Sequence, residues 1–452
     1  MVHTFEALGV KLAVDVNSGA VHVLDDLTYR LLPLVEPPMA EHCPPELLDR
    51  LPEYRTEAVE EGWQDLRELA GNGLLFVEDD YVDPAAATAL QQSAPIKALC
   101  LHVSHDCNLR CQYCFASTGD FGTGRKIMDI ETAKRAIDFV IQRSGSRRNI
   151  EVDFFGGEPL MAMDTVKATV AYARSIEKKA GKCFRFTITT NGVLLDDENI
   201  DYINREMSNA VLSLDGRPQV NDRMRKTVNG KGSYEVIVPK FQKLVAGRGT
   251  KDYYLRGTFT HYNLDFAEDV MHMADLGFRN VSVEPVVGEE TCGYALKDED
   301  LPVVLEQYEK LAEKLKDRAE VNFFHFNVDL AQGPCVIKRL RGCGAGCEYV
   351  AVTPEGDIYP CHQFVGNTAY KIGSLSDGSF DMELSHRFSC LNIYTREECR
   401  DCWARFYCSG GCSASNLLVN GDIKKPNHVG CEMERKRLEC AIALKALAAG
   451  MG

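Results

Sequence analysis

The sequence predicts an α/β protein built around a parallel sheet, with a smaller domain before it and a cysteine-rich domain after it. Strand-like and helix-like segments alternate from residue 96 to about residue 290, and cysteines gather after residue 320. The expected domains are 1–90, 91–320 and 321–452. The six strands of the middle domain are expected near 98–103, 150–155, 184–190, 210–215, 253–260 and 280–286. Helices are expected after Asp129, around 164–180, and at 432–449, where the helix should pack on the cysteine-rich domain.

The first domain is predicted to contain a hairpin, helices and a wing. Its first segment alternates apolar and polar side chains with the period of a half-buried strand, and turn residues follow it. We expect a strand at 10–16, a turn at 17–19 and a second strand at 21–23. Two helices should follow, one capped by Asp25 or Asp26 and one at 54–70. A wing made by 74–77 and 81–82 around an acidic turn at Asp79 and Asp80 should then lead into a linker at 83–95. This arrangement resembles the winged-helix-like domain with which enzymes recognise ribosomally made peptides.

Composition limits the possible classes of protein. The 452 residues are 45% hydrophobic and 26% charged, no apolar run is long enough to span a membrane, and the N-terminus lacks a secretion signal. We therefore expect a cytoplasmic protein with no membrane partner. Eighteen cysteines in a reducing compartment indicate metal thiolate ligation rather than disulfides, and oxygen-sensitive clusters would suit an anaerobic host.

The net charge of −15 is unevenly distributed. Residues 1–90 hold five Lys and Arg against eighteen Asp and Glu, a net charge of −13. This acidity argues against nucleic acid as a partner of the first domain. It favours a cationic ligand, or simply a solvated acidic surface.

Cys107, Cys111 and Cys114 form the central motif. They follow an expected strand with the spacing C-x3-C-x2-C, and Phe115 comes next. Three such thiolates can hold three corners of an iron–sulfur cube, which leaves its fourth iron free to chelate a small molecule. The alternative is a zinc knuckle, although zinc prefers four closed ligands. The motif resembles that of the radical S-adenosylmethionine (SAM) superfamily, in which SAM binds the free iron and the reduced cluster cleaves SAM to a 5′-deoxyadenosyl radical.

The second expected strand ends in Gly156, Gly157, Glu158 and Pro159. The glycines let the backbone approach a ligand closely, and a carboxylate accepts hydrogen bonds from an ammonium group. The segment resembles the GGE motif that holds the methionine amine of SAM, which implies that role for Glu158.

Polar residues also end the next two strands, at Thr190 and Asn191 and then at Ser213 and Asp215. Similar segments in the superfamily contact the ribose hydroxyls and carboxylate of SAM, although Asp215 could equally belong to an ordinary turn. Arg225 matches the position from which relatives reach the SAM carboxylate with a guanidinium. A surface arginine is the alternative reading.

The tail cysteines resemble the seven-cysteine SPASM domain, which carries two auxiliary [4Fe–4S] clusters. The resemblance assigns Cys343, Cys361 and Cys412 to the first cluster. It assigns four cysteines to the second, namely Cys399, Cys402, Cys408 and Cys431. Cys347 is additional: it could complete the first cluster, compete with Cys343 for one iron, or yield to a substrate thiolate. A zinc site is the alternative for the tail. The remaining cysteines are expected bystanders, namely Cys43, Cys100, Cys183, Cys292, Cys335, Cys390 and Cys440.

The combined resemblance implies a partial (β/α)6 radical SAM barrel between a leader-peptide recognition domain and a SPASM domain. It is greatest with thioether-forming, sactipeptide-type maturases, including six-cysteine peptide maturases. The implied cofactors are SAM and three [4Fe–4S] clusters, and the implied partners are a cysteine-rich precursor peptide with its leader and a reductant such as flavodoxin or ferredoxin. The adenosyl radical would take a hydrogen from a peptide carbon, a peptide cysteine sulfur would bond that carbon, and an auxiliary cluster would accept the surplus electron.

Three other functions remain open. A SPASM sulfatase maturase would oxidise Cys or Ser to formylglycine, a carbon–carbon crosslinking maturase would join two side chains, and an iron–sulfur redox scaffold would modify nothing. The sequence does not specify the peptide, the carbon attacked or the oligomeric state.

Overall fold

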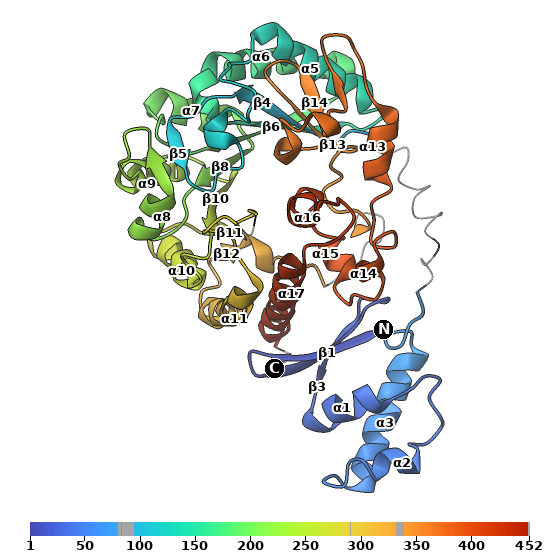
Figure 1. The fold of residues 1–452 in the computed structure, drawn as a ribbon. Coiled ribbons are helices and arrows are strands. Elements are labelled where there is room, and N and C mark those ends of the chain that lie inside the picture. Colours follow the sequence, from blue (N-terminus) through green and yellow to red (C-terminus); the bar gives the residue numbers. More distant parts are fainter. Residues whose placement is uncertain (80–82, 84–94, 290, 331–338, 451–452) are drawn as a thin grey trace.

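The computed structural model describes residues 1–79, 83, 95–289, 291–330 and 339–450. It shows an N-terminal domain beside a larger body organised on one ten-stranded sheet (Figure 1). Most of the predicted linker, the wing residues 81–82, Asp80 and Cys335 lie outside the described residues.

The large sheet has the strand order β12-β11-β10-β8-β7-β6-β4-β13-β14-β15. All pairs from β12 to β13 are parallel, and the last two pairs are antiparallel. Its strands are β4 (Ala98–Ser104), β6 (Asn149–Gly156), β7 (Cys183–Thr190), β8 (Asn209–Ser213), β10 (Asp252–Phe259), β11 (Asn280–Pro285), β12 (Asn322–Phe323), β13 (Tyr349–Val352), β14 (Asp357–Tyr359) and β15 (Gly373–Ser374). The first six are the six strands predicted from the sequence. Because β12 and β13 follow residue 320, the sheet continues across the predicted boundary of the third domain.

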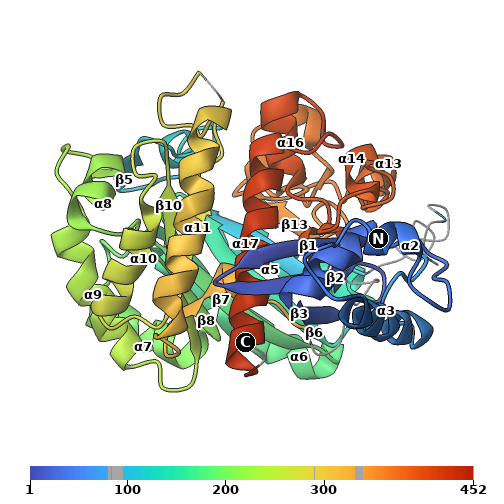
Figure 2. The same cartoon turned by 90° about the horizontal axis from the view of Figure 1, so that it is seen from below.

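Helices connect the parallel strands and cover the outer face of the sheet (Figures 1 and 2). They are α5 (Ile130–Arg143), α6 (Met163–Ala180), α7 (Asp197–Glu206), α8 (Pro218–Met224), α9 (Tyr234–Ala246), α10 (Phe266–Asp275) and α11 (Leu301–Lys316). The helix predicted after Asp129 is α5, and it is capped by Asp129, whose carboxylate accepts from the Thr132 backbone N–H at 2.8 Å. A short antiparallel pair, β5 (Leu109–Cys111) with β9 (Arg225–Thr227), lies apart from the large sheet.

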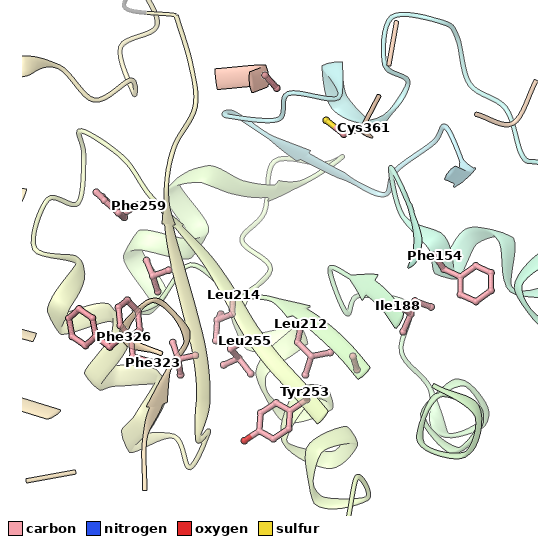
Figure 3. Packing of buried hydrophobic residues seen from close by; sticks show 14 of the residues in the cluster. Phe154, Ile188, Leu212, Leu214, Tyr253, Leu255, Phe259, Phe323, Phe326 and Cys361 are labelled. Atoms are coloured by element: carbon pink, nitrogen blue, oxygen red, sulfur yellow. The ribbon is translucent and has the colours of Figure 1, made fainter. Parts of the chain in front are cut away.

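Alternation along the strands separates the core from the site. Phe154 and Ile188 belong to a large apolar cluster, part of which is seen in Figure 3. Their chain neighbours Phe155 and Thr189 instead line a cavity. One strand thus supplies both the packing that fixes its position and the side chains that face a ligand.

The rest of the third domain is made of short helices and one long C-terminal helix. They are α13 (Met382–Ser389), α14 (Glu397–Arg400), α15 (Arg405–Cys408), α16 (Ser413–Asn420) and α17 (His428–Ala448). The helix predicted at 432–449 is α17. Besides bringing Cys431 to the tail cysteines, it packs along α11 and reaches β1 of the N-terminal domain, contacts that the sequence prediction did not include.

The N-terminal domain contains the antiparallel sheet β1 (Val2–Ala7), β2 (Val10–Asp15) and β3 (Val21–Leu24), with α1 (Asp26–Leu31), α2 (Pro45–Leu48) and α3 (Thr56–Gly71). One face of the sheet contributes Ala13 to a cluster with Leu31 and Trp63. The other face contributes Leu12 and Val14 to the main core. The small sheet therefore lies between its own helices and the body of the protein.

The predicted wing is not found at residues 74–77, which contain no strand. Leu75 is buried in the small domain, and the backbone N–H of Val77 donates to the Asp15 carboxylate at 3.2 Å. This segment caps the turn after β2 instead of forming a hairpin. Among the described helices, none is long and apolar enough to cross a membrane.

Candidate active site

A cavity of about 650 Å³ lies at the carboxyl ends of the parallel strands. Cys107, Cys111 and Cys114 line it together, on the loop that follows β4 and forms β5. Burial raises the pKa of Cys107 to about 12, with Glu158 and the other two thiols contributing. The three thiols predicted to share one cluster are therefore neighbours, and their chemistry fits iron ligation.

Two donors point at the sulfur of Cys107. The Leu109 backbone N–H lies 3.4 Å from Sγ, and the Asn191 side-chain amide lies 3.6 Å from it. The Asn191 amide also donates to Asn108 Oδ1 at 2.7 Å. Such donors stabilise a thiolate and tune the potential of a cluster bound to it. Asn191 thus faces the cysteine loop as well as the cavity.

Gly156 and Gly157 are required by the cysteine loop itself. A Cβ on Gly156 would lie 2.1 Å from the carbonyl oxygen of Ser104, and one on Gly157 would lie 2.3 Å from that of Asp106. Gly156 also has a φ of +130°, which side chains rarely adopt. The sequence predicts a close approach of these glycines to a ligand, whereas in the structure the closest neighbour of both glycines is the backbone that leads into Cys107.

Glu158 is buried and has an acceptor position to spare. One oxygen accepts from the Leu160 N–H at 3.0 Å and from Thr190 Oγ1 at 2.7 Å, and the other accepts from the Asn191 N–H at 2.8 Å. A carboxylate offers about four acceptor positions, so one remains. Because Glu158 lines the cavity, this position fits the ammonium group of SAM.

Arg225 is a buried residue of the site and not a surface arginine. Its Nη1 donates to the Tyr113 hydroxyl at 2.9 Å, and that hydroxyl donates to Asp215 Oδ2 at 2.7 Å. Arg225 Nε is buried without a partner among the described residues. Arg225 also lines the cavity, so its guanidinium group fits the carboxylate of SAM.

The predicted SAM contacts divide into two groups. Phe115, Gly156, Gly157, Glu158, Thr190, Asn191, Ser213 and Arg225 line the cavity. Pro159 and Asp215 are buried outside its lining. Burial raises the pKa of Asp215 to about 6, and its carboxylate is hydrogen-bonded to Tyr113 and to the Thr258 backbone. Asp215 therefore holds Tyr113 and Arg225 in place instead of facing the ligand directly.

Three charged residues that the sequence did not predict as site residues also line the cavity. Arg256 on β10, Glu284 on β11 and Arg437 on α17 line the cavity. Burial opposes ionisation of Glu284, but His325, Arg256 and Arg437 outweigh it and hold its pKa far below the usual range. The alternation of β10 and β11 could have indicated the first two residues. No sequence signal brings Arg437 to this wall.

The tail cysteines form the two predicted groups. Burial raises the pKa of Cys361, and nearby Cys412 and Cys343 add to the effect. In the second group, burial raises the pKa of Cys408 to about 11, with contributions from the neighbouring thiols of Cys431, Cys399 and Cys402. Cys408, Cys412 and Cys431 also line the same cavity as the central motif.

Cys347 neighbours Cys343, whereas Cys361 and Cys412 are not among the main contributors to its pKa. Burial raises its pKa to about 11, and Cys343 is the only cysteine among the main contributors. Its Sγ lies 3.3 Å from the Gly344 carbonyl oxygen. Cys343, by contrast, contributes to the pKa of both Cys361 and Cys412. Cys343 therefore neighbours Cys361 and Cys412 as well as Cys347.

Zinc was the alternative for both cysteine motifs. Over the described ranges, no three His, Cys, Asp or Glu side chains are arranged to hold a single metal ion.

Comparison with known proteins identifies two domains. Residues 101–248 match the Radical SAM superfamily, and residues 343–403 match the SPASM iron–sulfur cluster-binding domain. The chain is 24% identical over 345 residues to a cysteine-type anaerobic sulfatase-maturating enzyme of Clostridium perfringens, covering 70% of this chain and 89% of that one. It is 26% identical over 348 residues to the mycofactocin maturase MftC of Mycolicibacterium smegmatis, covering 74% and 82%.

Two solved structures share the fold. The enzyme anSMEcpe with bound AdoMet and the Cp18Cys peptide superposes with a TM-score of 0.65 at 20% identity, covering 79% of this chain and all of that one. Streptococcus suis SuiB bound to the precursor peptide SuiA gives 0.53 at 16% identity, covering 95% and 98%. The cysteines that line the cavity belong to the matched domains or lie close to them in the sequence. The chain carries a radical SAM domain joined to a SPASM iron–sulfur domain, with SAM and [4Fe–4S] clusters as its cofactors.

Proposed function

We propose that this protein is a peptide maturase that joins a cysteine sulfur to a carbon of another residue in a ribosomally made, cysteine-rich precursor. SAM bound at the first cluster supplies a carbon-centred radical that abstracts hydrogen. One observation carries the proposal: thiols of the central motif and of both tail groups, including Cys114, Cys408 and Cys412, line one cavity. A substrate there can meet the radical source and an electron acceptor together.

The SAM-binding roles belong to this proposal. Cys107, Cys111 and Cys114 would hold the first cluster. Glu158 would orient the SAM ammonium through its remaining acceptor position, and Arg225 would orient the carboxylate through its guanidinium group. Both charged groups are held by buried partners, so they are positioned before SAM arrives.

The first tail group supports sulfur chemistry. Cys343, Cys361 and Cys412 are mutual neighbours, whereas Cys347 has only Cys343 of these three among the groups that shift its pKa, and its thiol lies on a backbone carbonyl. Three protein thiolates would leave one iron of a cube able to accept a fourth. A substrate cysteine bound there would be a thiolate at neutral pH and would be fixed in position.

The N-terminal sheet supports recognition of a leader peptide. In the order β1-β2-β3, strand β3 is an edge, and no other described strand pairs with its outer side. All four residues of β3 are at least partly exposed. An extended peptide could add there as a fourth strand, with backbone hydrogen bonds for affinity and alternate side chains for selectivity.

The test is reaction of the reconstituted enzyme with SAM, a reductant and a cysteine-rich candidate peptide. Thioether formation removes two hydrogens and one alkylatable thiol, and it is abolished when the peptide cysteine is replaced by serine. Carbon–carbon crosslinking removes two hydrogens but leaves every thiol alkylatable. Formylglycine formation replaces the thiol by an aldehyde that reacts with hydrazines. Either of these products, or SAM cleavage without a peptide product, would overturn the proposal.

A further inference from the structure

Arg396 lies between the two groups of tail cysteines. It directly precedes α14 and is 4% exposed. The titratable groups that act electrostatically on it are Cys399 and Cys408 of one group and Cys412 and Cys343 of the other. One guanidinium is thus shared by two proposed cluster sites.

The guanidinium is held by neutral acceptors alone. Nη1 donates to the Gly410 carbonyl, and Nη2 donates to Ser413 Oγ at 2.9 Å and to the Ile423 carbonyl at 3.3 Å. A Cβ on Gly410 would lie 2.5 Å from Nη1, so the backbone there approaches the cation closely. Nε is buried without a partner in the described part of the chain. These contacts fix the position of the charge but do not neutralise it.

A buried cation needs a counter-charge. Across the described residues Arg396 forms no ion pair with a carboxylate. An isolated buried charge is strongly unfavourable, and removing the counter-charge of a buried ion costs several kcal/mol. Burial lowers the pKa of Arg396, and the four neighbouring cysteines, once deprotonated as cluster ligands, would oppose this effect. The available counter-charge is therefore the sulfur of the two cluster sites.

We propose that Arg396 is the shared counter-cation of both auxiliary clusters, and that its charge makes both of them easier to reduce. The inference rests on the proposed assignment of these cysteines to two clusters. Reduction adds one negative charge to a cluster, and net charge and surroundings set cluster potentials. A fixed cation in a buried, poorly screened position stabilises the reduced form more than the oxidised form.

The experiment compares Arg396→Gln, Arg396→Lys and a control, Arg435→Gln, each reconstituted as the full chain. Arg435 is near Cys431 of one group only, is about one-third exposed, and pairs with Glu432 at 2.8 Å. The readouts are iron per chain and the midpoint potentials of the auxiliary clusters, followed by electron paramagnetic resonance during a redox titration.

Arg396→Gln should lower the reduction constant of both auxiliary clusters at least tenfold, which is 59 mV for one electron. Arg396→Lys should remain closer to the wild-type potentials because it keeps the charge. Arg435→Gln should change one cluster only, by less than tenfold, because Glu432 and solvent already compensate that arginine.

Wild-type potentials in Arg396→Gln would overturn the inference. Where Arg396→Gln does not retain its iron, Arg396→Lys decides: retained iron supports a role of the charge, and equal loss assigns Arg396 to packing alone. Wild-type protein with only about four irons would refute the cluster assignment itself, whereas about twelve irons with unchanged potentials refutes only the role of Arg396.

Discussion

The imidazole of His3 stacks on the indole of Trp403 with ring centroids 4.0 Å apart and planes within 6°. Trp403 directly follows Cys402. A second contact is made nearby, where Arg405 donates to Asp79 at 2.8 Å and to Asn17 at 2.6 Å. The N-terminal domain thus contacts the segment between Cys402 and Cys408 at two points, so it contributes to the surroundings of the second tail group as well as offering an edge strand.

Removing the Arg405–Asp79 ion pair should lower the stability of the protein. The Arg405 and Asp79 side chains are 5% and 14% exposed, so Asp79→Asn leaves a buried guanidinium without its carboxylate. Loss of one partner of a buried pair costs about 3 kcal/mol. We expect a lower unfolding temperature by calorimetry and faster proteolysis after residue 79. The control is Arg30→Gln, whose ion pair with Glu53 is exposed and should contribute less than about 1 kcal/mol. Equal stability of the two variants would contradict the buried-pair argument.

Deletion of the N-terminal domain would remove both of these contacts with the third domain. Removing residues 1–79 would uncover Trp403 and Arg405 together. We expect this deletion to reduce the iron held by the second tail group, although it removes no proposed ligand. Iron analysis of the deletion variant checks this, and a full complement of about twelve irons would refute it.

Replacing Cys107, Cys111 and Cys114 by alanine should remove one cluster and leave the other two. Iron should fall from about twelve to about eight per chain, because each cube holds four. SAM cleavage under dithionite should disappear, since the open iron would be lost. The matched control is Cys183→Ala, a cysteine outside the cavity lining, which should keep both iron and cleavage. Cleavage by the triple variant would place the SAM site elsewhere.

The sequence could predict what depends on short segments. The six strands β4, β6, β7, β8, β10 and β11 are short segments with strand-like patterns, and C-x3-C-x2-C is a local spacing, so the sequence predicts both. The sequence did not predict β1, because this strand packs against Trp403 and α17, which are distant from it in the sequence. The prediction of a wing was wrong because Leu75 packs in the core of the small domain, and residues 74–77 do not form a strand.

Site residues that depend on distant packing could not be predicted. Arg437 reaches the cavity because α17 packs on α11, and Arg396 becomes a shared cation because two loops fold around it. Asp215 was expected to face the ligand because it follows a strand, but its hydrogen bonds turn it toward Tyr113. Spacing indicates which residues are close in sequence, whereas a buried network depends on the whole fold.

The acidic N-terminal domain should bind a basic leader peptide less tightly as salt rises. Residues 1–90 carry a net charge of −13, and exposed charges are screened within about 10 Å at 0.1 M salt. Calorimetric titration of the full chain at several salt concentrations checks this. Val23 is the most exposed residue of β3. Val23→Pro should weaken binding if the leader pairs with this edge, because proline removes a backbone donor. Equal modification of leaderless peptide would refute the recognition role.

The sharpest prediction separates Cys343 from Cys347. Cys347→Ala should preserve iron content, SAM cleavage and crosslinking, because its thiol lies on the Gly344 carbonyl and apart from Cys361 and Cys412. Cys343→Ala should keep SAM cleavage but lose thioether formation, because it removes a ligand of the group that would hold the substrate thiolate. Mass spectrometry of the peptide and measurement of 5′-deoxyadenosine give both quantities in one reaction.

A spectroscopic titration tests the thiolate directly. In Cys347→Ala the auxiliary cluster signal should change when a cysteine-containing peptide is added and should not change with its serine analogue, because only a thiolate can complete the iron's ligands. If Cys347 were a permanent fourth ligand, its loss would remove iron or alter the spectrum before peptide is added. Identical spectra with the two peptides would mean that the first tail group transfers electrons without binding the substrate sulfur.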